Sequence, residues 1–250
     1  MELDTAVILA AGYGSRLGNL TNIIPKSMLA VGEKTILDRN LDILQNNGVK
    51  TVYIVTGFGE EIIKKHIAKR KQKGELELEI TFVYNPDYGN KNNFYSLYVI
   101  KDFIKKDFYL LNSDLIYVES IFSKLKNFSK DVSTFIIDDY KELGTEEMKI
   151  IMDEKNNISQ FGKYISPQNA GGEYIGVAKI TLDLFNQYLS QCEELLTKKQ
   201  YNHYYEDVFS VLLMEKGAEI KGLSTDQAFW MEIDTAEDLR NSWDYIDILS

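Results

Sequence analysis

Short apolar runs alternate with amphipathic stretches through the first half of the chain. Four apolar runs are predicted to be strands, at 5–11, 51–57, 76–85 and 107–114. Between them, apolar residues recur at helical spacing, which predicts helices at 35–48, 60–74 and 92–104. Strands that alternate with helices favour a parallel sheet with helices on both faces. Such sheets bind ligands beyond the carboxyl ends of their strands.

The second half of the chain is richer in strands. Strands are predicted at 132–138, 147–153, 157–165 and 172–180. Helices at 181–197 and 204–216 follow, and after the segment 218–224 a final helix begins at Thr235. No linker separates two autonomous units, so one domain is expected over 1–250. The predicted fold is α/β, a mixed, mostly parallel, doubly wound sheet with a strand-rich lobe in the second half.

Charge and cysteine content narrow the classes of function. The formal net charge of −10 argues against a general nucleic-acid binder, which has a basic face. No apolar run approaches the roughly 20 residues that span a bilayer, and the chain does not open with the pattern of a signal peptide. Cys192 is the single cysteine, which excludes an internal disulfide and is compatible with a reducing compartment. We expect a cytoplasmic protein that binds neither nucleic acid nor membrane.

A turn rich in glycine follows the first strand, within AVILAAGYGSRLGNLTNIIPKSM at 6–28. Its glycines match neither of the two common phosphate-loop spacings. Glycines after a strand still let backbone N–H groups approach a polyphosphate, and Arg16 can offer its planar fork to phosphate oxygens. Lys26, further along the chain, would bring its positive charge back beside the same phosphates. The alternative is a tight turn with a solvated arginine and lysine, and for the turn alone the two interpretations are about equally supported.

Two acidic residues lie beyond predicted strands. Asp114 ends the segment LLNSD, and Asp234 precedes the final helix in FWMEIDTAEDL. Taken singly, each is explained as a helix cap. Taken together, they could hold Mg²⁺ against a triphosphate, which would explain how an acidic protein binds phosphates.

The whole N-terminal string is more specific than its parts. Leu9-Ala10-Ala11-Gly12, Gly14, Arg16-Leu17 and Pro25-Lys26 together resemble the signature of the nucleotidyltransferases that join an NTP to a phosphorylated small molecule. In that family the glycine loop wraps the triphosphate, and the lysine contacts the reacting phosphate. The resemblance implies a Rossmann-like nucleotidyltransferase fold and Mg²⁺ held by the two aspartates. The implied catalytic residues are Arg16, Lys26, Asp114 and Asp234.

The segment NPDYGNKNNFYSLY at 85–98 narrows the resemblance. Its NNFYSLY run resembles the bacterial phosphocholine cytidylyltransferases, and asparagine side chains can satisfy the donor and acceptor edge of cytosine. The alternative is a polar helix start with tyrosines in the core. The implied nucleotide-binding residues are Leu9, Ala10, Ala11, Gly12, Tyr13, Gly14, Ser15, Arg16, Lys26, Gly57, Asn92, Asn93, Ser96 and Asp114.

The resemblance implies a Mg²⁺-dependent cytidylyltransferase that joins CTP to a phosphorylated small alcohol and releases pyrophosphate. Phosphocholine is the first candidate acceptor, because aromatic faces attract a quaternary ammonium and neighbouring carboxylates could supply counter-charge. The tyrosines expected beside the acceptor could instead pack in the core, and Lys163 could be a solvated strand residue. The residues expected beside the acceptor are Tyr95, Lys163, Glu173, Tyr174, Tyr205, Glu206, Trp230 and Glu232.

Other functions are compatible with parts of this pattern. The chain also resembles enzymes that activate aminoethylphosphonate or inositol phosphate with CTP. A sugar-1-phosphate nucleotidyltransferase that uses UTP or dTTP is a further alternative, and an inert nucleotide-binding or assembly domain belongs to another class. Within the single domain, 1–130 is expected to bind mainly the nucleotide and 131–250 mainly the acceptor. A homodimer is compatible with either function.

Overall fold

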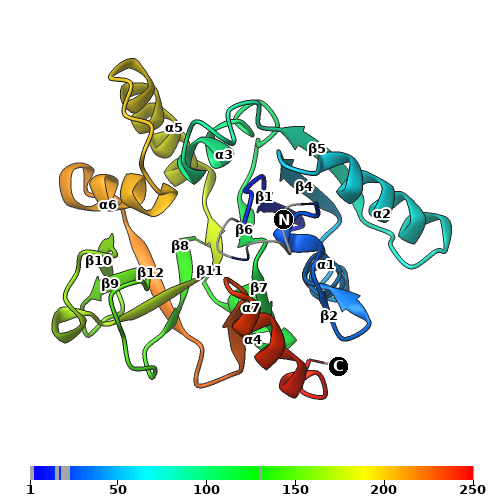
Figure 1. Ribbon diagram of the computed structural model, residues 1–250. Coiled ribbons are helices and arrows are strands. Elements are labelled where there is room, and N and C mark those ends of the chain that lie inside the picture. The colour runs from blue at the N-terminus through cyan, green and yellow to red at the C-terminus, as the bar shows by residue number, and fades with distance from the viewer. Residues whose placement is uncertain (1–2, 15–16, 18–22, 130, 250) are drawn as a thin grey trace.

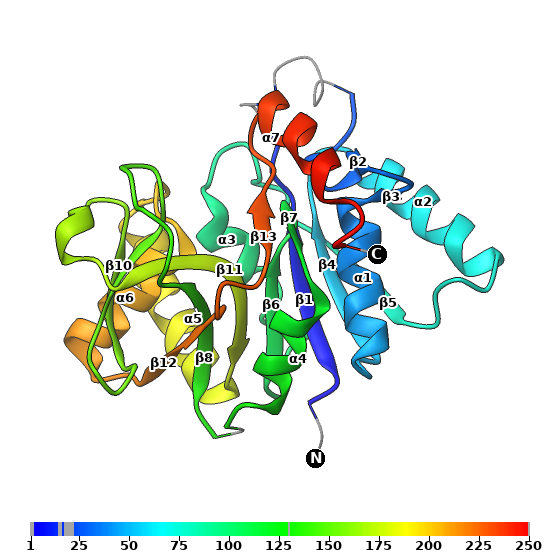
Figure 2. The same ribbon diagram turned by 90° about the horizontal axis from the view of Figure 1, so that it is seen from below.

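The computed structural model describes residues 3–14, 17, 23–129 and 131–249 (Figure 1). Within these ranges the chain forms a large central sheet with helices packed on both of its faces (Figures 1 and 2). No helix in these ranges is both long enough and apolar enough to cross a membrane.

The central sheet has nine strands, of which seven follow the order β10-β9-β11-β6-β1-β4-β5. Its first-half strands run parallel to one another, as the alternation of strands and helices predicted. They are β1 (Thr5–Ala10), β4 (Thr51–Thr56), β5 (Glu79–Tyr84) and β6 (Phe108–Asn112). Because parallel strands end at the same edge, the segments that follow β1 and β6 come together there.

Most second-half strands join this sheet by antiparallel pairing, whereas the last of them, β12 (Ile220–Ser224), pairs parallel with β8 (Ser133–Asp138). The long strand β11 (Gly172–Ile180) pairs antiparallel with β6 and with two further strands. The mixed α/β fold with a mostly parallel central sheet is thereby confirmed, while the functional division at residue 130 stays a prediction. The other second-half strands of the sheet are β8 (Ser133–Asp138), β9 (Lys149–Met152), β10 (Ile158–Gly162) and β12 (Ile220–Ser224).

Two short strand pairs lie outside the central sheet. One is the hairpin of β2 (Ala30–Val31) and β3 (Lys34–Thr35). The other pairs β7 (Leu115–Tyr117) antiparallel with β13 (Trp230–Glu232), so the end of the chain returns to the edge where β6 ends. This second pair is the one that matters for the site.

Alternate residues of β1 face opposite layers of helices, because successive side chains of a strand point to opposite faces. Val7 and Leu9 pack with residues of α3, α5 and α6, whereas Ala6 and Ile8 pack with residues of α1, α2 and α4. Burial on both faces explains why β1 is apolar throughout. The helices are α1 (Ile36–Asn46), α2 (Glu60–Gln72), α3 (Asn93–Tyr98), α4 (Glu119–Asn127), α5 (Leu182–Thr197), α6 (Tyr205–Lys216) and α7 (Ala236–Asn241).

One predicted helix is much shorter than expected. The helix predicted over 92–104 ends at Tyr98, and the chain continues to Ile104 in turns. Val99 and Ile100 are β-branched neighbours, which lose side-chain freedom in a helix. The chain then turns by tight i→i+3 hydrogen bonds, such as the one from the N–H of Lys101 to the carbonyl of Tyr98. The predicted start of the last helix is confirmed, because Thr235 caps α7.

Candidate active site

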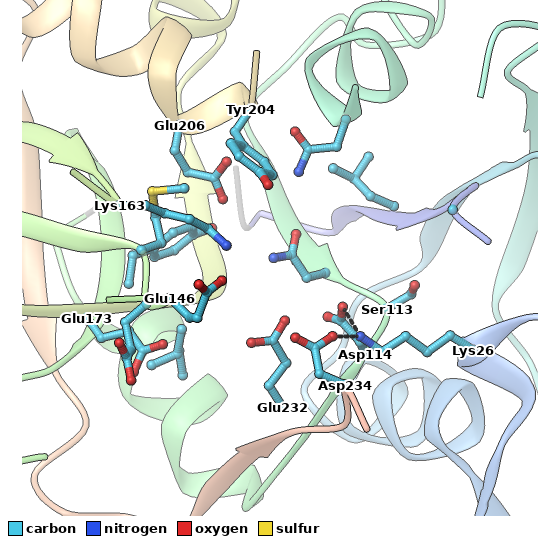
Figure 3. A pocket seen from close by; sticks show the side chains of 18 of the residues that line it. Lys26, Ser113, Asp114, Glu146, Lys163, Glu173, Tyr204, Glu206, Glu232 and Asp234 are labelled. Atoms are coloured by element: carbon cyan, nitrogen blue, oxygen red, sulfur yellow. Dashed lines mark hydrogen bonds and ion pairs between the residues drawn. The ribbon is translucent and has the colours of Figure 1, made fainter. Parts of the chain in front are cut away.

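A pocket of about 450 Å³ opens where β1 and β6 end (Figure 3). Both halves of the chain line it, as expected for the carboxyl edge of an open α/β sheet. Most of the residues predicted from the sequence meet in this pocket. They are Leu9, Ala11, Gly12, Gly14, Lys26, Asn92, Asn93, Ser96, Asp114, Lys163, Glu173, Tyr174, Glu206, Trp230, Glu232 and Asp234.

Lys26, Asp114 and Asp234 are brought together by the pairing of β7 with β13. Asp114 lies in the turn between β6 and β7. The N–H of Ile233 donates to the carbonyl of Asp114 at 2.9 Å, which fixes Asp234 beside it. Lys26 begins the short 3₁₀ turn η2 (Lys26–Met28), so its side chain enters the pocket from the opposite side.

The ammonium of Lys26 forms ion pairs with both aspartates (Figure 3). Its Nζ lies 2.8 Å from Oδ2 of Asp114, and it also pairs with Oδ1 of Asp234. Burial disfavours the charged form of this lysine, but the two carboxylates outweigh it and raise the pKa of Lys26. Lys26 is therefore charged at neutral pH.

Three carboxylates converge beside this lysine. Asp114, Glu232 and Asp234 each offer an oxygen, and these oxygens lie within 4.8 Å of one another. Oδ1 of Asp114 is buried and has no hydrogen-bond partner. Burial raises the pKa of Glu232 to about 8, and repulsion from the charges of Asp114 and Asp234 adds to this effect. Such a set of oxygens with an unpartnered buried member fits a hard divalent cation.

The glycine turn forms the floor of the pocket next to these acids. A Cβ added to Gly12 would meet no atom within 4 Å, so this part of the turn leaves open space. Gly14 has a φ of 64°, a conformation that favours glycine. Backbone groups here can therefore approach a ligand closely. Ser15 and Arg16 lie outside the described residues.

Three predicted nucleotide-binding residues do not line the pocket. Ala10 belongs to β1 and packs against the helices of the far face. Tyr13 is about half exposed, and its ring lies 5.2 Å from the ring of Phe58 and 5.0 Å from that of Tyr88. Gly57 supports the turn from behind, since a Cβ on it would come within 2.6 Å of the carbonyl oxygen of Ala11.

The polar residues at the start of α3 are held by hydrogen bonds before any ligand arrives. Asn92 caps the helix by accepting from the N–H of Asn93 at 2.7 Å. Oδ1 of Asn93 accepts from the N–H of Tyr205 at 2.9 Å. Oγ of Ser96 accepts from Nδ2 of Asn85 at 3.0 Å. These residues present amide and hydroxyl groups to the pocket in fixed positions.

Two of the tyrosines predicted beside the acceptor lie outside the pocket. The ring of Tyr95 stacks on Tyr98 and has the ammonium of Lys91 4.1 Å from its centre. Tyr205 is fully buried behind the wall, where its hydroxyl donates to Oδ1 of Asn112 at 3.0 Å. Both rings therefore act in packing rather than as open faces.

Glu206 is the most deeply buried acid of the pocket. Only 4% of its surface is exposed, and its Oε2 has no hydrogen-bond partner. Burial raises the pKa of Glu206 to about 8, and the charge of Lys163 offsets a small part of this effect. Lys163 extends over the ring of Tyr204, with its Nζ 5.2 Å from the ring centre (Figure 3).

The loop after β8 forms a charged wall that the sequence did not predict. Asp138 accepts from Nε1 of Trp230 at 2.7 Å and from the backbone N–H of Lys141 at 3.2 Å. Lys141 in turn pairs with Glu173, at 2.7 Å between Nζ and Oε2. This network fixes the indole ring of Trp230, and the ammonium of Lys141 lies 5.2 Å from its centre.

A buried lysine shapes the same loop. Lys149 has no exposed surface, and its ammonium donates to the backbone carbonyls of Gly144 at 3.2 Å and Glu147 at 3.1 Å. The loop so held carries Glu146 and Glu147, which line the pocket. Every residue carries a backbone carbonyl, so contacts of a lysine with nearby carbonyls leave no residue pattern, and no sequence signal could have identified Lys149.

Comparison with known proteins points to one family. A family model described as Nucleotidyl transferase matches residues 5–171. A CTP:phosphoglutamine cytidylyltransferase of Campylobacter jejuni is 26% identical over 253 residues, which cover 94% of this chain and 97% of that protein. The bifunctional IPC transferase and DIPP synthase of Aquifex aeolicus is 29% identical over 98% of this chain, which spans about half of that longer protein (52%).

Solved structures share the fold. The CTP:phosphocholine cytidylyltransferase of Streptococcus pneumoniae superposes with a TM-score of 0.80 at 21% identity, covering 98% of this chain and 100% of that one. The inositol-1-phosphate CTP transferase of T. maritima gives a TM-score of 0.83 at 20% identity, over 100% and 97% of the two chains. A UDP-glucose pyrophosphorylase gives a TM-score of 0.81 at 16% identity, over 99% and 100%.

Proposed function

Because this chain belongs to the nucleotidyl transferase family, we propose that it is a cytidylyltransferase that transfers CMP from CTP to the phosphate of a small acceptor. The observation that carries the proposal is the convergence of Lys26, Asp114 and Asp234 in one pocket, between the glycine turn and a charged wall. The C. jejuni relative, matched over nearly its full length, supports CTP as the nucleotide.

The proposed step is an in-line displacement at the α-phosphorus of CTP. A phosphate oxygen of the acceptor forms the new P–O bond, the bond from the α-phosphorus to the bridging oxygen breaks, and pyrophosphate leaves with the electron pair. The acceptor phosphate is already ionised at neutral pH, so no general base is needed. Catalysis then consists of positioning and charge neutralisation.

Each part of the pocket has a role in this proposal. The backbone of the glycine turn and Arg16 would hold the β- and γ-phosphates, and Lys26 would neutralise charge that develops on the α-phosphoryl group. The amide and hydroxyl groups at the start of α3 would contact the cytosine. Asp114 and Asp234, with Glu232 beside them, would hold Mg²⁺. When bound, this ion would supply Lewis-acid stabilisation of phosphate charge.

The acceptor is proposed to carry a cationic group, with phosphocholine as the first candidate. The buried, unpartnered oxygen of Glu206 supports a ligand that brings positive charge or a donor to this wall. Among the residues that the structure describes, three rings line the pocket; that of Tyr174 is buried, which leaves the rings of Trp230 and Tyr204 for contact with a ligand. Each already has a lysine ammonium 5.2 Å from its centre, so a choline head would have to displace Lys141 or Lys163 to reach a ring face.

A pyrophosphate-release assay tests this function. CTP and UTP should be compared with phosphocholine, phosphoethanolamine, aminoethylphosphonate, phosphoglutamine, inositol phosphate and glucose 1-phosphate. We expect turnover with CTP and an acceptor that carries an ammonium group. Glu206→Gln and Trp230→Ala should each raise the acceptor KM about tenfold while leaving the CTP KM unchanged. Trp243→Ala is the matched control, because this ring is exposed and lies outside the pocket.

Two outcomes of the assay would contradict parts of the proposal. Equal or better use of inositol phosphate would contradict the cationic acceptor but would agree with cytidylyltransferase activity. Turnover only with UTP and a sugar 1-phosphate would show that the nucleotide substrate is UTP and not CTP.

A further inference from the structure

A second cavity, of about 430 Å³, lies at the opposite edge of the sheet from the active site. It is built around the start of β6 and the ends of β11 and α4, with the first residue of α5 beside it (Figure 2). Tyr109 of β6 lines this cavity, whereas Asn112 of the same strand lines the active-site pocket. The two cavities are therefore separate sites at the two ends of one strand.

Four lysines line this second cavity: Lys105, Lys106, Lys126 and Lys179. Among the described residues that line the cavity, Asp107 is the single carboxylate, and its Oδ1 already accepts from the N–H of Leu182 at 2.8 Å. This concentration of positive charge occurs in a protein whose formal net charge is −10. Lys106 pairs with Asp4, and Nζ of Lys126 donates to the carbonyl of Asn47 at 2.7 Å, so the attraction of an anion to this cavity rests on Lys105 and Lys179.

Lys179 is the buried member of the group. Only 4% of its surface is exposed, and its ammonium donates to the backbone carbonyl of Ser129. Burial lowers the pKa of Lys179, and Asp107 and Asp131 only partly compensate. A buried ammonium without a close counter-ion is costly, and an anion in the cavity would stabilise it.

We propose that this second cavity binds a small phosphate-bearing molecule, with its phosphate held by Lys105 and Lys179. Lysine ammonium groups are common phosphate ligands, and the volume lies within the range of small-molecule sites. The remaining walls, formed by Leu3, Tyr109, Phe128 and Leu182, supply apolar surface for the rest of the ligand.

Lysine footprinting with inorganic triphosphate tests the site directly. The protein is treated with an acetylating reagent with and without triphosphate, and modified lysines are quantified by mass spectrometry. Gly12→Glu is used beside the native protein, because a carboxylate on the glycine turn would repel triphosphate from the active site, and a Cβ at this position would meet no atom within 4 Å. We expect acetylation of Lys105 and Lys106 to slow about tenfold in both proteins at a triphosphate concentration about ten times Kd. Lys198, which is exposed and lies outside both cavities, should be unaffected.

Calorimetric titration with triphosphate supplies the second measurement. In the Gly12→Glu background, Lys105→Gln and Lys179→Met should each weaken binding about tenfold, and Lys198→Gln should not. Lys105 is exposed, so its variant keeps the fold even if the buried Lys179 variant does not. Unchanged affinity in Lys105→Gln would overturn the proposal. In the footprinting experiment, KCl at matched ionic strength must not protect the lysines as well as triphosphate does; equal protection would overturn the proposal. Protection of these lysines by phosphatidylglycerol vesicles, without protection by triphosphate, would overturn it too.

Discussion

Nζ of Lys26 lies 2.8 Å from Oδ2 of Asp114, although 88 positions separate the two residues in the chain. The same ammonium pairs with Asp234, so one lysine neutralises two carboxylates that would hold a metal. An ammonium and a divalent cation repel each other and compete for the same oxygens. Under the proposed function we therefore expect Lys26 to leave the aspartates when Mg²⁺ and a triphosphate bind, with the phosphates as its new partner.

The role of Lys26 is tested by Lys26→Ala. We expect kcat to fall by roughly 10²-fold or more, with a much smaller change in the KM for CTP, because its charge matters most in the transition state. Steady-state kinetics measure both constants. Lys34→Ala is the matched control, since Lys34 also forms an ion pair with an aspartate, Asp42, but on the surface. Turnover at the native rate in Lys26→Ala would show that this lysine has no role in the reaction.

The two aspartates are tested by Asp114→Asn and Asp234→Asn. Each should abolish Mg²⁺-dependent turnover because an amide is a weaker ligand than a carboxylate for a hard cation. Circular dichroism should show an unchanged fold, because an amide fills the same volume as the carboxylate it replaces. Asp102→Asn, at an exposed position, is the control. If both variants remain active at low Mg²⁺, the metal binds elsewhere.

Lys149 is predicted to be a positioning residue for the acceptor wall. Lys149→Met keeps the length of the side chain but removes the donors that hold the carbonyls of Gly144 and Glu147. We expect the KM for the acceptor to rise about tenfold and the KM for CTP to stay within about twofold, because only one wall of the pocket loosens. Lys155→Met, in the exposed turn before β10, is the control. Equal increases in both constants would indicate a general loss of structure.

Glu206 makes stability depend on pH. Folding raises the pKa of Glu206 from 4.5 to about 8, so between these values the folded protein holds a proton that the unfolded chain releases. The free energy of unfolding should therefore fall as pH rises through this window, by up to about 1.4 kcal/mol per pH unit from this group. Urea unfolding at several pH values should show a shallower fall in Glu206→Gln, and no such change in Glu215→Gln at an exposed position. Parallel profiles for Glu206→Gln and the native protein would contradict the assignment.

The sequence was sufficient to predict the strands of the parallel half and the meeting of Lys26, Asp114 and Asp234. Apolar runs and the residues that follow them carry that information locally. Sequence adjacency did not reveal which face of a helix meets the pocket. Tyr205 and Glu206 are neighbours, but successive residues of a helix point about 100° apart, and only Glu206 lines the pocket.

The charged wall after β8 could not be predicted for a different reason. Asp138 is fixed by Trp230, which lies 92 positions away, and Lys149 acts on backbone carbonyls that every sequence contains. Neither contact has a spacing or a residue pattern that a single sequence displays. The contact between Asp138 and Trp230 becomes visible only once β13 places Trp230 beside the loop.

The pairing of β13 with β7 also has a consequence for the synthesis of this protein. The four parallel strands β1, β4, β5 and β6 and the glycine turn can emerge from a ribosome and fold early, because they lie in the first half of the chain. Asp234 joins Asp114 only after β13 has been translated and has paired with β7. A nascent chain, or a proteolytic fragment cut before Trp230, would hold a glycine turn that can approach phosphates but an incomplete set of carboxylates. Under the proposed function, the glycine turn therefore folds before the carboxylates that would hold the metal are brought together.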